Sequence, residues 1–329
     1  MCSLFGFLDY QGIIPHKFLR KLTQALANAA EERGTDAAGI SYVKDGQIVI
    51  FKRPKPAHRL HFNPPEGTRA VMGHTRMTTQ GNEKYNYNNH PFYGETGDIS
   101  WSLAHNGIIY NDKELRKEKQ LPVTAIETDS YIAVQLIESQ HNLDFESLRY
   151  MAEQVQGSFN FSILDDRNNL YLIKGNNPLC LLNFKSLGLY VYASTESIMK
   201  AALRRLGFNK YASEKIDTTE GDIIRIDKNG NITCSQFQSA LKYTHYSRCK
   251  WWYGDYEDYF STYEETLVEM AHLFGADEND VIMLIDYGYT ADEVADLLMD
   301  TGMFQEAVRE VKLMSGEYIY DNYCYGGVF

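Results

Sequence analysis

The sequence predicts an α+β fold in which two β-sheets are covered by helices. Strand-like segments gather at both ends of the first 237 residues, and helix-like segments gather in the middle. A parallel α/β fold would instead alternate strands and helices along the chain. The chain has 329 residues, of which 44% are hydrophobic, so it can bury a large core.

The chain is expected to open with a strand followed by a helix. Residues 4–8 form a short apolar run that would place Cys2 at the end of a strand. After Pro15, apolar residues recur at the spacing of one helix face as far as Ala29. Further strands are expected at 39–43, 47–51, 69–72, 158–164, 169–174, 189–193, 223–226 and 231–233, and further helices at 128–139 and 196–206. The Asp-Gly and Asn-Gly dipeptides between two of the strand pairs are typical of β-hairpins.

The composition changes near Lys242, where tyrosine and tryptophan become frequent in an acidic stretch. Helical patterns follow, and Thr290 with Glu293 forms the signature of a capping box. The other helices of this region are expected at 265–274, 280–286 and 304–314. We therefore predict two domains: residues 1–240, which form the α+β unit, and residues 241–329, a small, acidic, Tyr/Trp-rich and mostly helical appendage.

Most of the negative charge belongs to the C-terminal region. The net charge is −12, yet residues 251–329 hold 18 acidic side chains and only two basic ones, whereas residues 1–250 hold 26 acidic and 30 basic ones. Such an acidic surface repels phosphate backbones, so we expect no nucleic-acid partner. The chain has no apolar run of ~18–20 residues and no charged-then-apolar leader before Cys2. We therefore expect a soluble, cytoplasmic protein that does not associate with a membrane.

The five cysteines predict neither a disulfide framework nor a metal centre. Cys180, Cys234, Cys249 and Cys324 are widely scattered, and no Cys-x-x-Cys pair occurs. Disulfide scaffolds are also typical of much shorter chains. Cys180 stands in an apolar run and is expected in the core. No metal and no cofactor is predicted.

Cys2 is the most informative residue of the chain. Removal of Met1 would leave a thiol and a free α-amine on the same residue. A thiolate is a strong nucleophile, and an α-amine with a pKa near ~8 can accept its proton without a histidine. Cys2 is therefore the candidate nucleophile, on the condition that Met1 is removed.

Two runs of polar residues and glycine follow along the chain. The run RGTDAAG, from Arg33 to Gly39, predicts a tight turn from a helix into a strand. The run GHTRMTTQG places Arg76 among hydroxyl-bearing residues and closes with a glycine. The planar fork of an arginine suits a carboxylate, so Arg76 is a candidate ligand for one.

Three further runs complete the set. In AHNGII, the side chain of Asn106 and the N–H of Gly107 are two neutral donors that could converge on one oxyanion, although Asn-Gly is also a common turn. In ETDS, Thr128 would be the N-cap of a helix, or Asp129 would bind a cation. The run NNHPF at 88–92 lies between the run that contains Arg76 and the run that contains Asn106.

Taken in order, the N-terminal cysteine and the motifs RGxDxxG, GHTRxxTxG, NxHP, HNG and ETDS resemble the class II glutamine amidotransferases. These enzymes are N-terminal-nucleophile hydrolases. The similarity is closest to the glutaminase domain of glucosamine-phosphate synthase and continues to about residue 237. It implies that the α+β unit is a four-layer αββα sandwich.

The same resemblance implies a function and a set of residues. Glutamine would be hydrolysed to glutamate and ammonia through a thioester at Cys2, whose own α-amine would serve as base and then as acid. The implied catalytic residues are Cys2, Asn106 and Gly107, the implied substrate-binding residues are Arg76, Thr79 and Asp129, and the implied supporting residues are Arg33, Gly34, Asp36 and His74.

The sequence departs from the family at Met77 and Gln80, where the closest relatives often carry Trp and His on the loop that closes over glutamine. Such glutaminases feed ammonia to a synthase domain, and residues 241–329 contain no phosphate-binding loop or other synthase pattern. We favour a glutaminase that acts alone or donates ammonia to a separate protein docked through 241–329. Two alternatives remain: an N-terminal cysteine hydrolase for another amide, and a non-catalytic glutamine-binding or interaction module.

Overall fold

The computed structural model describes residues 2–238, 267–268 and 271–315. They fall into two compact units, one within residues 2–254 and the other within residues 255–329. Each unit is considered by itself. The predicted domain boundary at residue 240 lies outside the described residues.

The first sheet has seven strands in the order β11-β9-β10-β1-β4-β2-β3, and all neighbouring pairs are antiparallel. Its strands are β1 (Ser3–Asp9), β2 (Ala37–Lys44), β3 (Gln47–Arg53), β4 (Ala70–Arg76), β9 (Cys180–Phe184), β10 (Leu189–Ala193) and β11 (Glu214–Ile216). The N-terminal strand β1 is thus paired on both sides. This double pairing holds the backbone next to Cys2 in place.

The second sheet has six strands in the order β13-β12-β8-β7-β6-β5, again with antiparallel neighbours. Its strands are β5 (Phe92–Thr96), β6 (Ile99–Ile109), β7 (Gly157–Asp165), β8 (Leu170–Lys174), β12 (Asp222–Ile226) and β13 (Ile232–Gln236). The longest strand, β6, carries Asn106 and Gly107 near its end.

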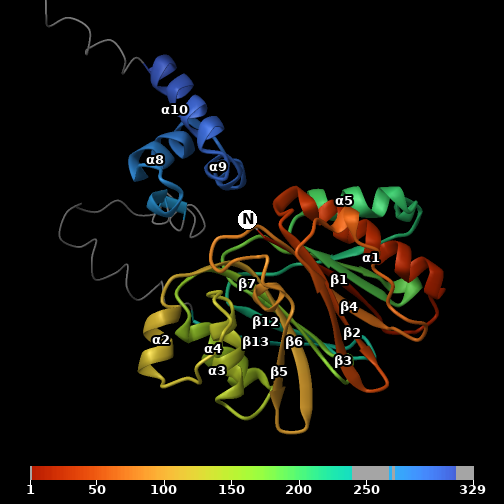
Figure 1. Cartoon of the computed structure of the whole chain (residues 1–329). Helices are drawn as coiled ribbons and strands as arrows, with labels where there is room; N and C mark the ends of the chain where they lie inside the picture. Colours follow the sequence, from red (N-terminus) through yellow and green to blue (C-terminus); the bar gives the residue numbers. More distant parts are fainter. Residues whose placement is uncertain (1, 239–266, 269–270, 316–329) are drawn as a thin grey trace, which may run out of the picture. The chain divides into compact units, whose positions relative to one another are not determined.

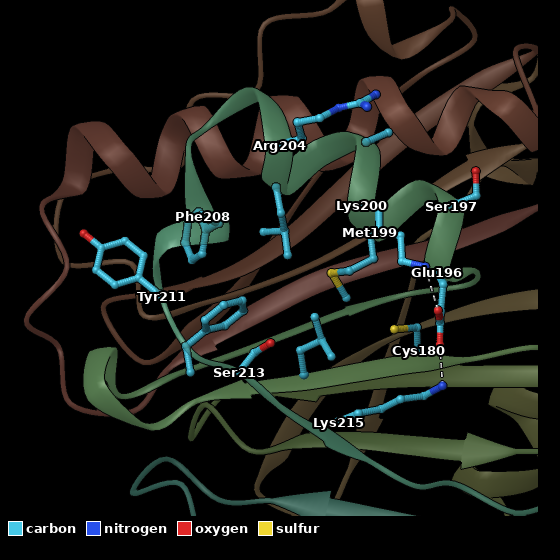
Figure 2. A pocket seen from close by; sticks show the side chains of 14 residues that line it. Cys180, Glu196, Ser197, Met199, Lys200, Arg204, Phe208, Tyr211, Ser213 and Lys215 are labelled. Atoms are coloured by element: carbon cyan, nitrogen blue, oxygen red, sulfur yellow. Dashed lines mark hydrogen bonds and ion pairs between the residues drawn. The ribbon is translucent and has the colours of Figure 1, made fainter.

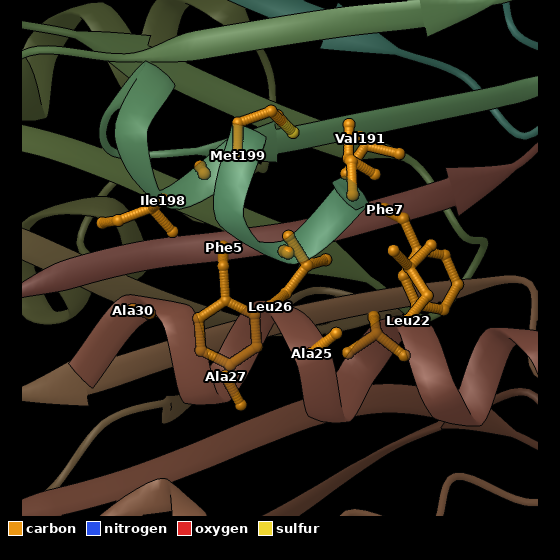
Figure 3. Packing of buried hydrophobic residues seen from close by; sticks show 14 of the residues in the cluster. Phe5, Phe7, Leu22, Ala25, Leu26, Ala27, Ala30, Val191, Ile198 and Met199 are labelled. Atoms are coloured by element: carbon orange, nitrogen blue, oxygen red, sulfur yellow. The ribbon is translucent and has the colours of Figure 1, made fainter. Parts of the chain in front are cut away.

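Helices cover the outer face of each sheet (Figure 1). The helices α1 (His16–Ala30) and α5 (Glu196–Arg205) pack on the first sheet, where Phe5 and Phe7 of β1 meet Leu22 and Leu26 of α1 and Met199 of α5 (Figure 3). The second sheet is covered by α2 (Asp112–Glu118), α3 (Tyr131–Glu138) and α4 (Phe145–Gln154).

The two sheets pack face to face. A third buried cluster consists of strand residues of both sheets, among them Leu4 and Met72 from the first sheet and Ala104 and Leu172 from the second. Alternate side chains of β1 point in opposite directions, so Phe5 and Phe7 face the helices while Leu4 and Leu8 face the other sheet. The predicted four-layer αββα sandwich is confirmed.

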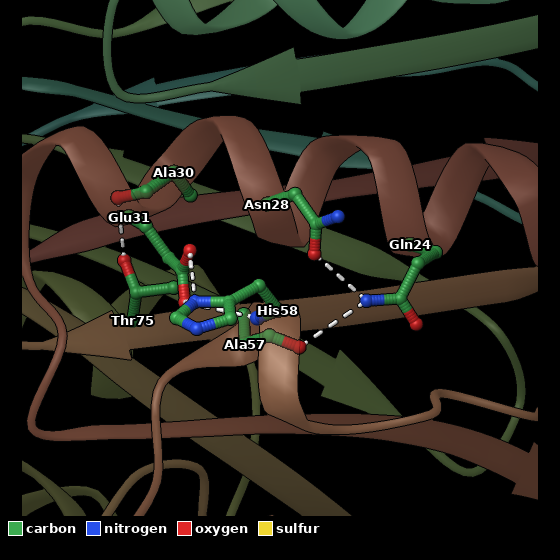
Figure 4. Close-up of polar contacts among 7 residues, drawn as sticks. All are labelled: Gln24, Asn28, Ala30, Glu31, Ala57, His58 and Thr75. Carbon is green, nitrogen blue, oxygen red and sulfur yellow. Dashed lines mark hydrogen bonds and ion pairs between the residues drawn. The ribbon is translucent and has the colours of Figure 1, made fainter.

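The α1 helix is also tied to its sheet by polar contacts (Figure 4). At its C-terminal end, the carbonyl of Ala30 accepts a hydrogen bond of 2.8 Å from the Thr75 hydroxyl of β4. Along the helix, the Gln24 amide donates to Asn28 Oδ1 at 2.8 Å and to the Ala57 carbonyl at 3.2 Å. The helix end is therefore fixed next to the end of β4.

The predicted elements of this unit lie where the sequence placed them, apart from short shifts at their ends. The helix predicted at 128–139 begins only at Tyr131, with Ser130 at its N-cap position and no side-chain capping bond. The interpretation of Thr128 as N-cap is therefore wrong. The helices α2 and α4 and the strands β5, β6, β9 and β11 were not predicted from the sequence.

The described residues of the second unit form a separate helical cluster. It comprises η7 (Ala271–Phe274), α8 (Glu278–Tyr287), α9 (Ala291–Leu298) and α10 (Thr301–Ser315), which share one apolar core. Thr290 and Glu293 form the predicted capping box at the start of α9. The helix predicted at 265–274 lies partly outside the described residues. Throughout the described ranges, each helix is too short or too polar to cross a bilayer.

Candidate active site

Cys2 lies directly before β1, at the end where β1 meets β4. Ser3 pairs with Thr75, so Cys2 stands next to the register position of Arg76. The side chain is buried, and its Sγ donates to the Met77 carbonyl at 3.4 Å. Burial raises the pKa of the Cys2 thiol, and the Met77 hydrogen bond and the charge of Arg76 only partly oppose this. The thiol is therefore protonated at neutral pH.

Arg76 is the last residue of β4, and its guanidinium is held by the protein. It donates to Asn89 Oδ1 at 2.7 Å and to the carbonyls of Gln80 and Gly81 at 2.6 and 3.1 Å. Burial lowers its pKa, whereas Cys2 and Asp129 act in the opposite direction. These three bonds use three of the five N–H groups of the fork, which leaves donors for a carboxylate.

The RGxDxxG segment lies against the backbone that follows Arg76. The Asp36 carboxylate accepts from the Thr78 N–H at 2.7 Å, and the Asp36 N–H donates to the Arg76 carbonyl at 3.0 Å. A Cβ on Gly34 would lie 2.5 Å from the carbonyl carbon of Arg76, so this close approach requires glycine. Arg33 is buried at the start of the turn.

Asp129 is buried at the N-terminal approach to α3 and faces the end of β6. Its Oδ2 accepts from the Ile109 N–H at 2.6 Å, and its Oδ1 accepts from the Ser130 hydroxyl at 3.3 Å. Burial raises its pKa to about 6, although the hydrogen bonds from Ile109 and Ser130 oppose the shift. The negative charge of Asp129 adds to the raised pKa of Cys2, and it opposes the lowering of the pKa of Arg76.

Asn106 is connected to β1 through Ser194. The Ser194 hydroxyl accepts from the Leu4 N–H at 2.8 Å and from the Asn106 amide at 3.3 Å. Asn177 donates to the Asn106 carbonyl at 2.9 Å. The Asn106 side chain is fully buried, and its Oδ1 has no hydrogen-bond partner among the described residues, whereas Gly107 is half-buried.

Three buried histidines lie behind Arg76. His74 Nε2 donates to the His105 carbonyl at 2.8 Å, and the His74 ring lies 4.1 Å from the His90 ring. Burial lowers the pKa of His74 and of His105 to about 3 and that of His90 well below 6.5. All three rings are neutral at physiological pH. They fill space, and His74 and His105 also form hydrogen bonds.

The structure thus brings Cys2, Arg76 and Asp129 into one region, together with the segment that braces Arg76. Thr79 is exposed on the loop between Arg76 and Gly81. No role was predicted for Asn89, Ser130, Asn177 or Ser194. Asn89 and Ser130 lie in the runs NNHPF and ETDS, whereas Asn177 and Ser194 lie in the later part of the chain, over which the similarity continues to about residue 237. None of these residue types is distinctive by itself.

A cavity of about 820 Å³ lies elsewhere, between α5 and the strands β9 and β11 (Figure 2). Its lining includes Cys180, Met199 and Phe208, and Glu196 forms ion pairs there with Lys200 and Lys215. The predicted site residues do not line it. In the described ranges, no group of three or more His, Cys, Asp or Glu side chains is arranged to hold a metal ion.

Comparison with known proteins agrees with this geometry. Residues 74–201 match the family model of a glutamine amidotransferase domain. Over 194 residues the chain is 32% identical to glutamine–fructose-6-phosphate aminotransferase (isomerizing) of Staphylococcus aureus strain Mu50, which covers 55% of this chain and 30% of that protein. The chain carries a class II glutamine amidotransferase domain.

A second curated relative is similar in sequence, and two solved structures share the fold. The corresponding aminotransferase of Staphylococcus epidermidis strain ATCC 12228 is 32% identical over 188 residues, which cover 54% of this chain and 30% of that protein. Glutamine phosphoribosylpyrophosphate amidotransferase from B. subtilis shares the fold, with a TM-score of 0.54 and 19% identity over 72% of this chain and 49% of that one. A structure described as the allosteric regulatory enzyme of purine biosynthesis has a TM-score of 0.56 at 20% identity and the same coverage.

Gly107 of this amidotransferase domain should not tolerate a side chain. Its φ is +143°, and an added Cβ would lie 1.9 Å from the Ser158 carbonyl oxygen. Gly46 is the matched control, because its φ is +72° and an added Cβ would meet nothing within 4 Å. We expect Gly46→Ala to lower the free energy of unfolding by about 1 kcal/mol. Gly107→Ala should lower it by at least about 2 kcal/mol more. Equal losses in urea unfolding would contradict this.

Proposed function

We propose that this chain hydrolyses the side-chain amide of L-glutamine to glutamate and ammonia through a thioester at Cys2. The observation that carries the proposal is the meeting of a buried thiol, a buried guanidinium and a buried carboxylate at the ends of β1, β4 and β6. An α-amino acid offers one carboxylate and one ammonium group, which Arg76 and Asp129 would bind. The amide at the end of its side chain would then face Cys2.

The thiol needs a base, because its raised pKa keeps it protonated in the resting site. Both His74 and His105 have pKa values of about 3, which makes them poor proton acceptors at neutral pH. The α-amine of Cys2 would serve instead once Met1 is removed. It would take the thiol proton and later give it to the departing ammonia.

The oxyanion of the tetrahedral intermediate would form beside Asn106 and Gly107. The Ser194 hydroxyl bonds both to the nucleophile strand and to the Asn106 amide, so it fixes the donor relative to the attacking sulfur. A donor that is fixed before the charge develops needs no reorganisation in the transition state. The N–H of Gly107 would be the second donor.

The ammonia released by the hydrolysis needs an acceptor if it is to be used. The chain spans about 30% of the length of the curated relatives that it matches. We propose that a separate acceptor protein receives the ammonia and docks through the acidic region 241–329. The alternative is that the ammonia is simply released.

The thioester route requires both Cys2 and the removal of Met1. We expect the processed chain to release equal amounts of glutamate and ammonia from glutamine, whereas Cys2→Ala should release neither. Cys234→Ala is the control, because Cys234 is exposed and lies on β13. Mass spectrometry would establish whether Met1 is absent. A processed chain whose Cys2 does not react with 6-diazo-5-oxo-L-norleucine would refute the proposal.

Substrate binding and transition-state stabilisation should separate in the kinetics. Arg76→Ala removes a group that binds the carboxylate in both the ground state and the transition state, so it should mainly raise KM for glutamine. Asn106→Ala removes an oxyanion donor and should lower kcat by about 10²–10³-fold with little change in KM. Steady-state kinetics of both variants would test this, and the reverse pattern would contradict the assigned roles.

Binding of the α-ammonium should depend on pH through Asp129. The carboxylate must be ionised to attract the ammonium, and its pKa in the free protein is about 6. KM for glutamine should therefore be nearly constant from about pH 7 to about pH 8 and should rise by about tenfold per pH unit well below pH 6. Asp129→Asn should have a high KM at every pH and no such rise. A wild-type KM that stays flat down to pH 5 would argue against Asp129 as the ammonium ligand.

A further inference from the structure

Lys52 is a half-buried ammonium group near Arg76 to which the proposed mechanism gives no task. It lies on β3, the edge strand of the first sheet. We propose that Lys52 is a positioning residue for the carboxylate clamp: it holds the 86–91 segment in place so that Asn89 keeps the Arg76 guanidinium aligned. This inference rests on the proposed function, because the clamp is for the glutamine carboxylate.

The contacts of Lys52 converge on that segment. Its Nζ donates to the Asn89 carbonyl at 2.5 Å and to the Pro91 carbonyl at 2.9 Å, and it lies 4.9 Å from the centroid of the Phe92 ring. Its own carbonyl accepts from the Asn86 amide at 3.0 Å. A single lysine thus bonds to both ends of the segment and joins the edge strand of one sheet to the first residue of β5 in the other.

Gly39 allows the 86–91 segment to lie close to β2 and β3. It is the last residue of the RGxDxxG motif and pairs with Lys52 across β2 and β3. A Cβ on Gly39 would lie 2.3 Å from the His90 carbonyl oxygen and 2.7 Å from Lys52 Cβ. The 86–91 segment therefore lies directly against the β2–β3 hairpin. A side chain at position 39 would leave no room for it, which explains the glycine in the motif.

Asn89 links the 86–91 segment to the Arg76 guanidinium by a hydrogen bond. Its Oδ1 accepts from Arg76 at 2.7 Å, and its Nδ2 donates to the Glu83 carbonyl at 2.8 Å. The side-chain amide therefore cannot turn without losing a bond on each side. Because the Asn89 carbonyl is bonded to Lys52, displacement of Lys52 would move the acceptor that orients the arginine fork.

The charged form of Lys52 is less favourable in this site than in water. Burial lowers its pKa to about 8, and the positive charge of Arg76 adds to the shift. The titratable groups that face it are Arg76 from β4 and His90 from the segment, and burial keeps His90 neutral. The ammonium is thus offset by two carbonyl dipoles and by the face of Phe92 rather than by a carboxylate. Such an arrangement weakens as the proton is lost.

The first test compares three lysine variants of the processed enzyme. Lys52→Met should raise KM for glutamine about tenfold and leave kcat within about twofold, because the clamp loosens while Cys2 and Asn106 stay in place. Lys52→Arg keeps the charge and the donors, so it should restore most of the affinity. Lys44→Met is the matched control, since Lys44 is exposed on the same hairpin. An unchanged KM in Lys52→Met would overturn the inference.

A pH profile gives a readout that a merely structural role would not change. Above pH 8, deprotonation of Lys52 weakens its bonds to the segment, so the wild-type KM should rise between pH 8 and pH 9. Lys52→Arg stays protonated and should lack this rise. Titration of the Cys2 thiol and amine affects both proteins equally. The same rise in wild type and Lys52→Arg would overturn the inference.

Alkylation of Cys2 separates this inference from the proposed function. In Lys52→Met, the half-saturation concentration of 6-diazo-5-oxo-L-norleucine should rise, whereas the rate with iodoacetamide, which has no carboxylate, should match wild type. Equal changes with both reagents would show general disruption and refute the positioning role. If Lys52→Met does not fold, Asn89→Ala takes its place with the same expected pattern. A wild-type enzyme that does not hydrolyse glutamine would refute the function itself.

Discussion

The antiparallel register of β1, β4 and β2 is the constraint on which the site depends. Ser3 pairs with Thr75, and Arg76 pairs with Ala37. Cys2, Arg76 and the Asp36 turn therefore come to the same edge of the first sheet. A slip of one residue would turn Phe5 away from the α1 helix and Leu4 away from the second sheet, so the hydrophobic pattern fixes the register and the register fixes the site.

Burial of polar groups is the common physical theme at this edge. It raises the pKa of Cys2 and of Asp129, and it lowers the pKa of His74. A protein optimised only for stability would avoid so many desolvated polar groups, because each loses hydration. Their concentration around one thiol is typical of a site that binds a charged substrate and excludes water from it. The large apolar core between the facing surfaces of the two sheets offsets the free-energy cost of burying these groups.

The sequence predicted much of this architecture because its signals are local. The apolar face of the α1 helix, the hairpin dipeptides and the ordered motifs each lie within a few residues. The links between motifs are not local: Ser194 meets Asn106 across 88 positions, and Lys52 meets Asn89 across 37. Pairings of that range depend on how the two sheets stack, and no periodicity encodes that. The Thr128 error is a local one, because the helix begins three residues later, at Tyr131.

The loop after Arg76 shows how the two departures from the family pattern are accommodated. The side-chain amide of Gln80 donates to Asp112 at 3.3 Å and to the Glu127 carbonyl at 3.1 Å, while the backbone carbonyl of Gln80 accepts from Arg76. At Met77 the backbone carbonyl, rather than the side chain, accepts from the Cys2 thiol. The loop is therefore attached to the site mainly through main-chain atoms. Substitution at these two positions can change how the loop closes while the hydrogen bonds to the thiol and to the arginine remain.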